Sequence, residues 1–167
     1  MPPKQTEKYH VCRGRVFQQT RLFTTVMTSD WPKGLDQFGE FLLQQGLSFE
    51  RRGVVPSTGD KLWQYGTSTI GVRVLAEKGT NWTVWIADIA GWPQQWYPSR
   101  YVREFLTGRV DDDWPHSNVN NGIDEQMRFV EDQWTAIVES FRDDKREETH
   151  GKLKALGEQQ NRRYFGL

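Results

Sequence analysis

The chain has few of the residues that build covalent or metal-bound frameworks. Its 167 residues include one cysteine, Cys12, and three histidines. A single cysteine excludes an internal disulfide framework. His10, His116 and His150 are not at the spacing of zinc ligands, so no metal site is predicted. Cys12 lacks a His or Asn pattern around it, and we interpret it as an ordinary thiol.

Long apolar runs and catalytic motifs are also missing. No window approaches the roughly eighteen apolar residues of a membrane-spanning helix, and no signal-peptide pattern is present. We therefore expect a cytoplasmic protein that does not contact a membrane. The sequence has neither a Gly-x-Ser-x-Gly elbow nor a glycine-rich phosphate loop. It predicts no catalytic residue and no cofactor, so an enzyme is the least favoured class.

Charge is balanced overall but unevenly distributed. The 22 basic and 22 acidic residues give a net charge of zero. Residues 1–29 contain five basic residues and one acidic residue, whereas residues 109–148 contain twelve acidic and five basic residues, a net charge of −7. Zero net charge without a continuous basic patch argues against nucleic-acid binding. An acidic stretch suits a basic protein partner.

The first 26 residues differ from the rest of the chain. They are basic and show no clear periodicity, whereas Met27 precedes a sequence typical of a protein start. We predict that residues 1–26 are a basic leader and that residues 27–167 form a single domain. The competing interpretation is an additional edge strand over Val16–Val26, which β-propensity permits.

The middle of the chain predicts a helix followed by antiparallel strands. Apolar residues at helical spacing indicate a helix over Trp31–Gln45, capped by Asp30. Strands are predicted over Leu47–Val55, Leu62–Gly66, Ser68–Ala76 and from Trp82 onward, with turns at residues 56–60 and 77–81. The strand from Trp82 is apolar on both faces, which predicts a central strand covered on both sides. Asp88 within it requires a partner, and Arg73 or Arg100 is expected.

The C-terminal half predicts helices. A short helix runs from Pro98 to Gly108, after a turn that contains Trp92, Trp96 and Tyr97. Six apolar residues then repeat at 4-3-4-3-4 spacing and predict one helix of about five turns: Ile123, Met127, Val130, Trp134, Ile137 and Phe141. A last helix is predicted over residues 144–163. The fold class is therefore α+β, an antiparallel meander of three to five strands packed against an N-terminal helix, a short middle helix and two C-terminal helices.

A weak pattern of order and composition links the chain to a known class. The pattern consists of WTVWIADIAGWPQQWYPSRYVREFLTG at 82–108 and the C-terminal residues Thr149, Leu153, Leu156, Arg162, Arg163, Tyr164, Phe165 and Gly166. Over residues 27–167 the chain resembles small bacterial immunity proteins encoded beside polymorphic toxins. This resemblance implies a cytosolic, non-enzymatic inhibitor that masks a toxin. The class has no shared functional residues to transfer.

Acidic and aromatic residues are the candidates for contacting a partner. They are Asp111, Asp112, Asp113, Trp114, Asp124, Glu125, Trp92, Trp96 and Arg100. Clustered acids steer a basic partner, and Trp is enriched at interface hot spots. The alternatives are a solvated acidic loop and aromatics that only cap the core. A nucleic-acid-associated or regulatory protein that uses arginines and aromatics is the second functional hypothesis. The sequence predicts no oligomeric state.

Overall fold

A computed structural model describes residues 31–77, 81–90, 94–109 and 121–165. The chain divides into two units, Met1–Trp31 and Pro32–Leu167, and the described helices and strands all belong to the second. The predicted leader, the competing strand over Val16–Val26 and the proposed cap Asp30 lie outside the described residues.

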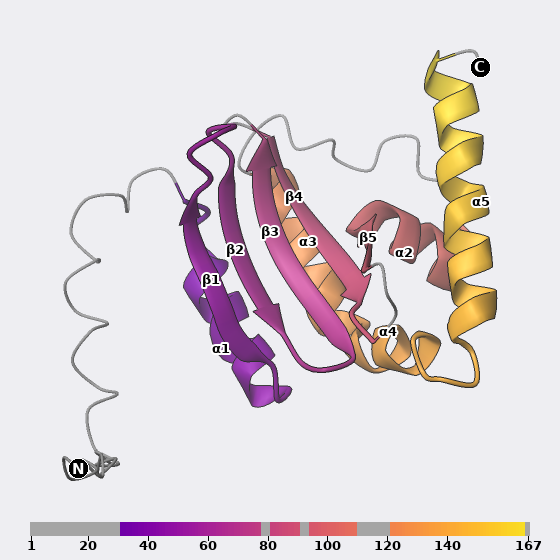
Figure 1. Cartoon of the computed structure of the whole chain (residues 1–167), viewed down its shortest axis with the longest axis horizontal. Helices are drawn as coiled ribbons and strands as arrows, with labels where there is room; N and C mark the ends of the chain where they lie inside the picture. The colour runs from indigo at the N-terminus through magenta and orange to yellow at the C-terminus, as the bar shows by residue number, and fades with distance from the viewer. Residues whose placement is uncertain (1–30, 78–80, 91–93, 110–120, 166–167) are drawn as a thin grey trace, which may run out of the picture. The chain divides into compact units, whose positions relative to one another are not determined.

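Five strands form one antiparallel sheet in chain order, which confirms the predicted meander (Figure 1). They are β1 (Ser48–Val54), β2 (Lys61–Gly66), β3 (Ile70–Glu77), β4 (Asn81–Asp88) and β5 (Gln95–Pro98). The turn between β1 and β2 uses Gly59 at a φ of +75°, a conformation that costs glycine little. Because consecutive strands pair directly, residues that face each other across the sheet can be assigned from the hairpin register.

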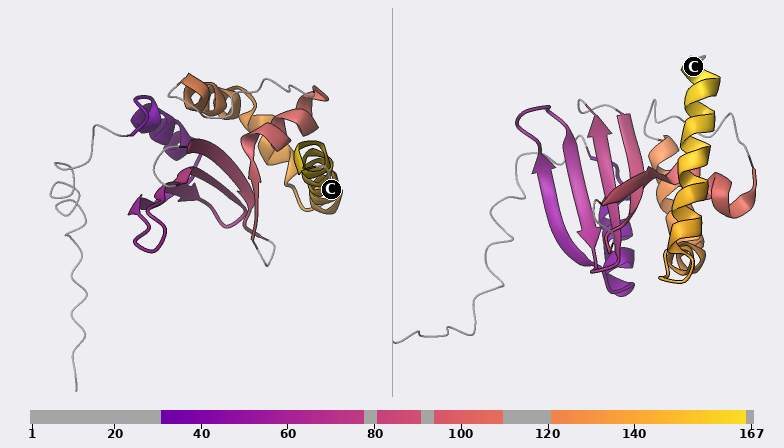
Figure 2. Two further views of the ribbon diagram at one scale, coloured as in Figure 1. Left: turned by 90° about the horizontal axis from the view of Figure 1, so that it is seen from above. Right: turned by 45° about the vertical axis from the view of Figure 1, so that its right-hand side comes forward.

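The helices surround one face and one edge of the sheet, which confirms the α+β class. They are α1 (Leu35–Gln44), α2 (Ser99–Thr107), α3 (Asn121–Asp132), α4 (Trp134–Ser140) and α5 (Arg146–Phe165). α1 and α3 lie on the same side of the sheet, whereas α2, α4 and α5 lie toward the β5 edge (Figure 2). No helix among the described residues is long and apolar enough to span a membrane.

The core lies between the sheet and helices α1 and α3. Val72, Val74, Val84 and Ile86 alternate along β3 and β4 and are fully buried. Trp63 on β2 faces the same side and packs against Phe38 of α1, with ring centroids 6.0 Å apart. Burying such large aromatic side chains contributes a large share of the apolar area removed from water. This helix-covered face is the main source of stability.

The opposite face has no helix on it among the described residues (Figure 1). On β4, the side chains of Thr83 and Trp85 point to this side and are half-buried. β4 was expected to be covered on both sides, but the described helices cover only one of its faces. We call the other side the open face. It comprises Leu62, Gln64, Arg73, Leu75, Thr83, Trp85 and Trp96, which share one side of the strands by register.

The predicted five-turn helix is two helices. All six residues of its apolar seam are buried, so the periodicity was a correct guide to the core. The helix nevertheless bends at Gln133, where φ is −107° and ψ is 11°. Two backbone hydrogen bonds, Gln133 N–H to Phe129 O and Ile137 N–H to Gln133 O, span the bend. α3 and α4 therefore remain connected but point in different directions.

Two other boundaries differ from the prediction. α1 begins at Leu35, after a turn closed by the Leu35 N–H to Pro32 O hydrogen bond, and not at Trp31. Trp96 and Tyr97 belong to strand β5 and not to a turn, because they pair with Ala87 and Ile86 of β4. Within a strand, adjacent residues point to opposite faces. Trp96 therefore lies on the open face and Tyr97 on the helix-covered face.

A buried glutamine on α3 forms hydrogen bonds with β4 and with the first residue of α2. The Gln126 side chain of α3 is 2% exposed. Its carbonyl oxygen accepts hydrogen bonds from the Val84 backbone N–H at 3.0 Å and from the Ser99 hydroxyl at 2.9 Å. Buried backbone groups require such partners. Gln126 thus fixes α3 and the start of α2 relative to the sheet.

The end of α2 gives a first testable prediction. Gly108 follows the helix at a φ of +66° and its N–H bonds to Glu104 O. Gly108→Ala is expected to destabilise the protein by about 1 kcal/mol, because residues with a Cβ disfavour this conformation. Urea unfolding measures the change. Gly53→Ala is the control: Gly53 has open space around it and no positive φ. Equal effects of the two substitutions would contradict the cap.

Candidate functional site

The structure separates the predicted partner-binding residues. Trp92, Asp111–Asp113 and Trp114 lie outside the described residues, so their role stays a prediction. Asp124 and Glu125 are exposed near the start of α3, which lies on the helix-covered side. Trp96 is on the open face. The described candidates therefore do not form one surface.

Asp124 has a structural role on α3. Asp124 lies in the first turn of α3, where a carboxylate interacts favourably with the positive end of the helix dipole. Arg100 of α2 is half-buried, and its guanidinium carbon lies 4.9 Å from the centre of the Tyr101 ring. Its Nη2 also donates to the Tyr101 hydroxyl at 3.2 Å. These contacts hold Arg100 against its own helix.

The centre of the open face is an arginine between two tryptophan rings. The guanidinium carbon of Arg73 lies 5.1 Å from the centroid of Trp85 and 4.3 Å from that of Trp96. Arg73 on β3 is directly opposite Trp85 on β4, and Trp96 reaches it from β5. Arginine stacks favourably on aromatic faces at such distances. We call Arg73, Trp85 and Trp96 the tryptophan–arginine stack.

A glycine makes room for this arrangement. Gly71 is on the open face opposite Ala87, which in turn pairs with Trp96. A Cβ at Gly71 would lie 3.1 Å from Trp96 Cη2 and 2.6 Å from Ile89 Cδ1. The 2.6 Å approach is closer than real Cβ atoms come to another atom, so a larger residue at position 71 would displace Ile89, and the 3.1 Å approach would press on Trp96. The bare backbone of Gly71 therefore allows Trp96 to lie across β3 and β4 toward Arg73.

The stack contains polar groups without hydrogen-bond partners. Arg73 Nε and Trp85 Nε1 are buried, and neither has an acceptor among the described residues. Burial lowers the pKa of Arg73 from its usual value. In the described part of the chain, no carboxylate forms an ion pair with Arg73. Unsatisfied buried donors are uncommon in native proteins, so these two atoms require an explanation.

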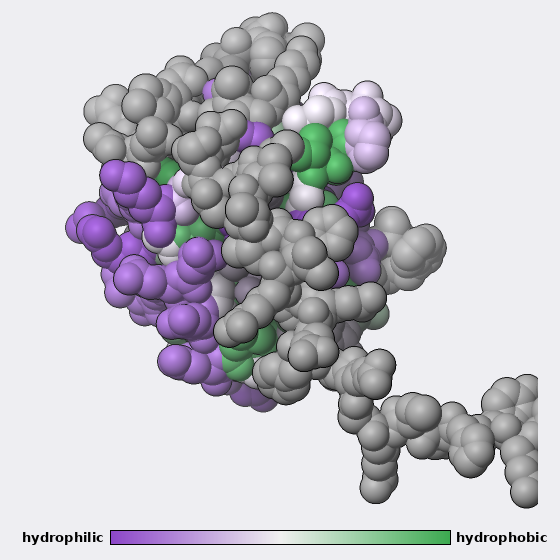
Figure 3. Space-filling view, turned by 90° about the vertical axis from the view of Figure 1, so that its left-hand side faces the viewer, coloured by the Kyte–Doolittle hydropathy of each residue, from purple (hydrophilic) through white to green (hydrophobic). Residues whose placement is uncertain are grey.

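The free edge of the sheet is less suited to binding than the open face. β1 is the edge strand, and its register shifts between Phe49 and Arg51. It also carries Glu50, Arg51 and Arg52. Bulges and charges on an edge strand prevent pairing with other strands. On the side of the molecule where β1 lies, the coloured surface is mostly hydrophilic, with small separate hydrophobic areas (Figure 3).

A second polar group lies on the other face of β4, around Asp88. Asp88 is 1% exposed, and its Oδ2 is 2.8 Å from His150 Nε2 and 2.6 Å from Arg146 Nε. Its Oδ1 accepts a hydrogen bond from the Ala90 N–H. The expected partners Arg73 and Arg100 are wrong. Asp88 pairs with Ile70 across the sheet, so it points away from Arg73 and toward α5.

Tyr97 extends this group, which we call the Asp88 cluster (Asp88, Tyr97, Arg146 and His150). The Tyr97 hydroxyl is 2.6 Å from His150 Nδ1 and 2.6 Å from Gln95 Oε1. Burial, with a smaller effect of the Asp88 charge, raises the pKa of Tyr97 to about 12. A tyrosine that retains its proton and already has two partners is a poor nucleophile or base. The cluster is therefore suited to holding elements together.

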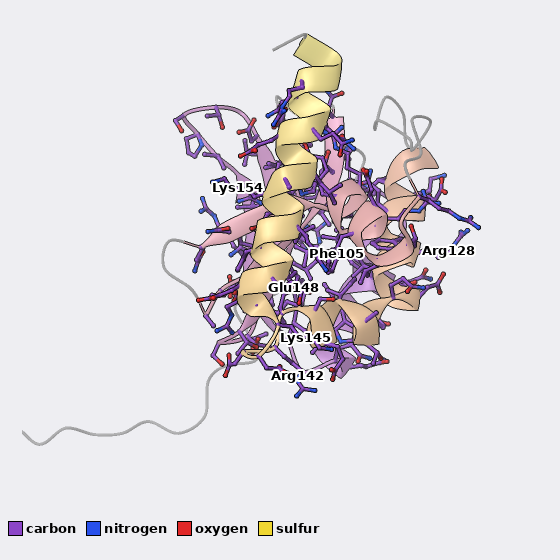
Figure 4. All side chains as sticks on the ribbon, turned by 90° about the vertical axis from the view of Figure 1, so that its right-hand side faces the viewer. Phe105, Arg128, Arg142, Lys145, Glu148 and Lys154 are labelled. Carbon is purple, nitrogen blue, oxygen red and sulfur yellow. The ribbon has the colours of Figure 1, made fainter. Side chains whose placement is uncertain are left out.

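The element held by this cluster is α5. Among its described side chains, 146–162, only Thr149 and Leu153 are buried, so apolar packing alone attaches the helix weakly. The Thr149 hydroxyl donates to Ser140 O at 2.6 Å, and Gln160 donates to Glu104 of α2 at 2.9 Å. Figure 4 shows α5 with Phe105 of α2 beside it. Polar contacts to β4, β5 and α2 thus position α5.

No group of three or more metal-ligating residues occurs in the part of the chain that the structure describes. Neither a family model, nor a curated protein, nor a solved structure matches this chain. The tryptophan–arginine stack is therefore the candidate site on its geometry alone. Sequence analysis identified Trp96 but not Trp85 or Arg73 as candidates. The missed signal was the 77–81 hairpin, whose register places Arg73 opposite Trp85.

Proposed function

We propose that this chain is a non-enzymatic protein-binding module whose contact surface is the open face. The observation that carries the proposal is the tryptophan–arginine stack on a sheet face without a covering helix in the described residues. Trp and Arg are the residue types most enriched among binding hot spots, which lie in partly preorganised, desolvated positions. Half-buried Leu75 and Thr83 beside the stack extend the apolar contact area.

Within this proposal, the chain acts as an immunity-type inhibitor that masks a toxin. The resemblance of residues 82–108 to that class supports this role, and the stack falls partly within them, at Trp85 and Trp96. A rigid sheet bearing stacked aromatics pays little conformational entropy on binding, because its side chains are already held in place. Such a surface suits a protein that must bind its partner tightly.

A nucleic-acid partner is less well supported by the open face. Beside the stack, Arg51 pairs with Gln64, and Glu50 bonds to the same glutamine. With Arg73 and Glu77, the charged residues of the described strands on this side are two basic and two acidic. Nucleic-acid binding depends on several cations that contact phosphates. A face with balanced charge does not provide them.

Position-specific photocrosslinking in the source cell tests the proposal. A photoreactive residue at position 83 is expected to capture a protein partner. The same residue at position 40, exposed on α1 on the other side of the sheet, is expected not to capture it. The captured partner is then purified, and its affinity is measured. Equal capture at both positions would show that the open face is not the contact surface.

Thr83→Arg provides the quantitative prediction. A long charged side chain on the open face, two residues from Trp85 on β4, should weaken binding of the captured partner at least tenfold, or by about 1.4 kcal/mol. Glu40→Arg, which introduces the same residue on α1, should leave affinity unchanged. Circular dichroism verifies that both variants fold. Unchanged affinity for folded Thr83→Arg would refute the proposal. For the immunity-type role, the captured protein should be a toxin whose activity wild type suppresses and Thr83→Arg does not.

A further inference from the structure

The tryptophan–arginine stack lacks an acceptor. Arg73 Nε and Trp85 Nε1 are neighbouring donors, both buried and both without a hydrogen-bond partner among the described residues. A buried donor without an acceptor costs free energy in the unbound chain. These two atoms are enclosed, whereas the Arg73 side chain as a whole is only half-buried, so a partner would meet the stack at the rest of that side chain. The group that meets it there would therefore be an oxygen acceptor.

The charge of the site specifies the acceptor further. Arg73 is half-buried, and burial disfavours its charged form. The described acidic residues on the open face are engaged or peripheral: Glu50 accepts a hydrogen bond from Gln64 at 2.5 Å, and Glu77 is exposed at the end of β3. The positive charge is therefore not compensated within the described residues. An anionic acceptor would be favoured over a neutral one.

The position of the Arg73 guanidinium beside two indole rings favours a small planar anion. The guanidinium carbon of Arg73 lies over the indole rings of Trp85 and Trp96, 5.1 Å and 4.3 Å from their centroids. The donors of the guanidinium lie in its own plane, and the terminal nitrogens are not among the buried atoms that lack a partner. The edge of a guanidinium matches a carboxylate, which arginine binds through two parallel N–H···O bonds.

We propose that Arg73 is the receptor for an acidic side chain of the protein partner, an Asp or Glu flanked by apolar residues that contact Trp85, Trp96 and Leu75. This inference rests on the proposed protein-binding function and specifies the partner's chemistry at one point. It concerns a different surface from the acidic stretch of residues 109–148, for which a basic partner was predicted. A partner that contacts both surfaces would present an acidic group to the sheet and basic groups elsewhere.

The test selects short peptides from a random displayed library on the full chain. Peptides that bind the open face are recognised because they shift the indole N–H NMR signals of Trp85 and Trp96. We expect these peptides to contain Asp or Glu between apolar residues. Replacing that Glu by Gln in the peptide, or Arg73→Gln in the chain, should each weaken binding about tenfold. Making both changes should weaken binding no further, because the two groups act as one pair.

Arg128→Gln is the matched control. Arg128 projects from α3 away from the sheet (Figure 4) and is exposed, so its replacement should leave peptide affinity unchanged. If Arg73→Gln does not fold, Arg73→Lys keeps the charge but loses the planar fork. It should then bind the acidic peptide several-fold more weakly. The Glu→Gln change in the peptide tests the same contact on unmodified protein.

The possible results separate the two proposals. Peptides that shift the indole signals but need no acidic residue would overturn the carboxylate receptor and leave the protein-binding surface intact. A selection in which no peptide shifts those signals would count against the surface itself, and the carboxylate receptor would fail with it. Short single-stranded RNA that shifts the same signals more tightly than any peptide would replace both with a nucleic-acid function.

Discussion

Asp88→Ala is expected to lower the free energy of unfolding by about 3–5 kcal/mol, among the largest effects of a single substitution in this chain. The carboxylate is fully buried, whereas the Arg146 and His150 side chains that face it are 22% and 20% exposed. Removing it leaves a largely buried arginine and histidine without their acceptor and opens a cavity on β4. Equilibrium unfolding in urea measures the loss.

Asp143→Ala is the matched control for this prediction. Asp143 also pairs with Arg146, at 2.8 Å, but its side chain is 92% exposed. Exposed ion pairs contribute little because water competes for both charges. Its removal should therefore change stability only slightly. If Asp88→Ala and Asp143→Ala have similar effects, the buried contact does not stabilise the protein as proposed.

The loss in Asp88→Ala should also be localised. α5 has few buried apolar side chains, so it depends on the Asp88 cluster more than the other helices do. We expect hydrogen exchange to accelerate in α5 before it accelerates in β3 or β4. Uniform acceleration across the sheet and α5 would mean that the cluster stabilises the whole domain rather than the attachment of one helix.

The helices and hairpins were predictable because their signals are local. The periodic apolar residues from Ile123 to Phe141 are all buried, in α3, in α4 and directly after α4. Gly46, predicted to end the first helix, follows α1 at a φ of +86°. The bend at Gln133 was not predictable, because the sequence there contains neither proline nor glycine. Tertiary packing, which overrides local propensity, must position this break.

Strand β5 was missed because it is short. It has four residues, Gln95–Pro98, and Trp96 and Tyr97 within it face opposite sides of the sheet. A strand of this length beside prolines has the same local pattern as an aromatic turn. Its existence depends on pairing with β4, which is a non-local fact. Consequently the sequence could not assign Trp96 to the open face.

The partner of Asp88 shows which part of the site was accessible from sequence. The register of the hairpin at residues 77–81 implies that Asp88 and Arg73 are on opposite faces of the sheet, because side chains alternate along a strand. Arg73 could therefore have been excluded, and Trp85 recognised as its neighbour. The true partners, Arg146 and His150, are about sixty residues further along the chain. Only the packing of α5 on the sheet brings them to Asp88.

Trp134→Ala should destabilise the protein by about 3–5 kcal/mol, which is typical of removing a buried tryptophan. Trp134 is 8% exposed and is the first residue of α4, directly after the bend at Gln133. Its ring meets that of Phe41 on α1 edge-on, with centroids 6.0 Å apart. This ring contact thus connects the N-terminal helix α1 to the C-terminal helix α4.

Trp134→Phe tests whether packing causes this effect. A phenyl ring can keep an edge-on contact with Phe41 but fills less volume, so Trp134→Phe should lose clearly less stability than Trp134→Ala. Urea midpoints with unchanged denaturant slopes would attribute both losses to the folded state. A near-neutral Trp134→Ala would mean that α1 and α4 are held together by other contacts. Because Trp134 is on the helix-covered side, the folded fraction of both variants should still bind the partner normally. Loss of binding with retained stability would instead place the contact surface on the helices.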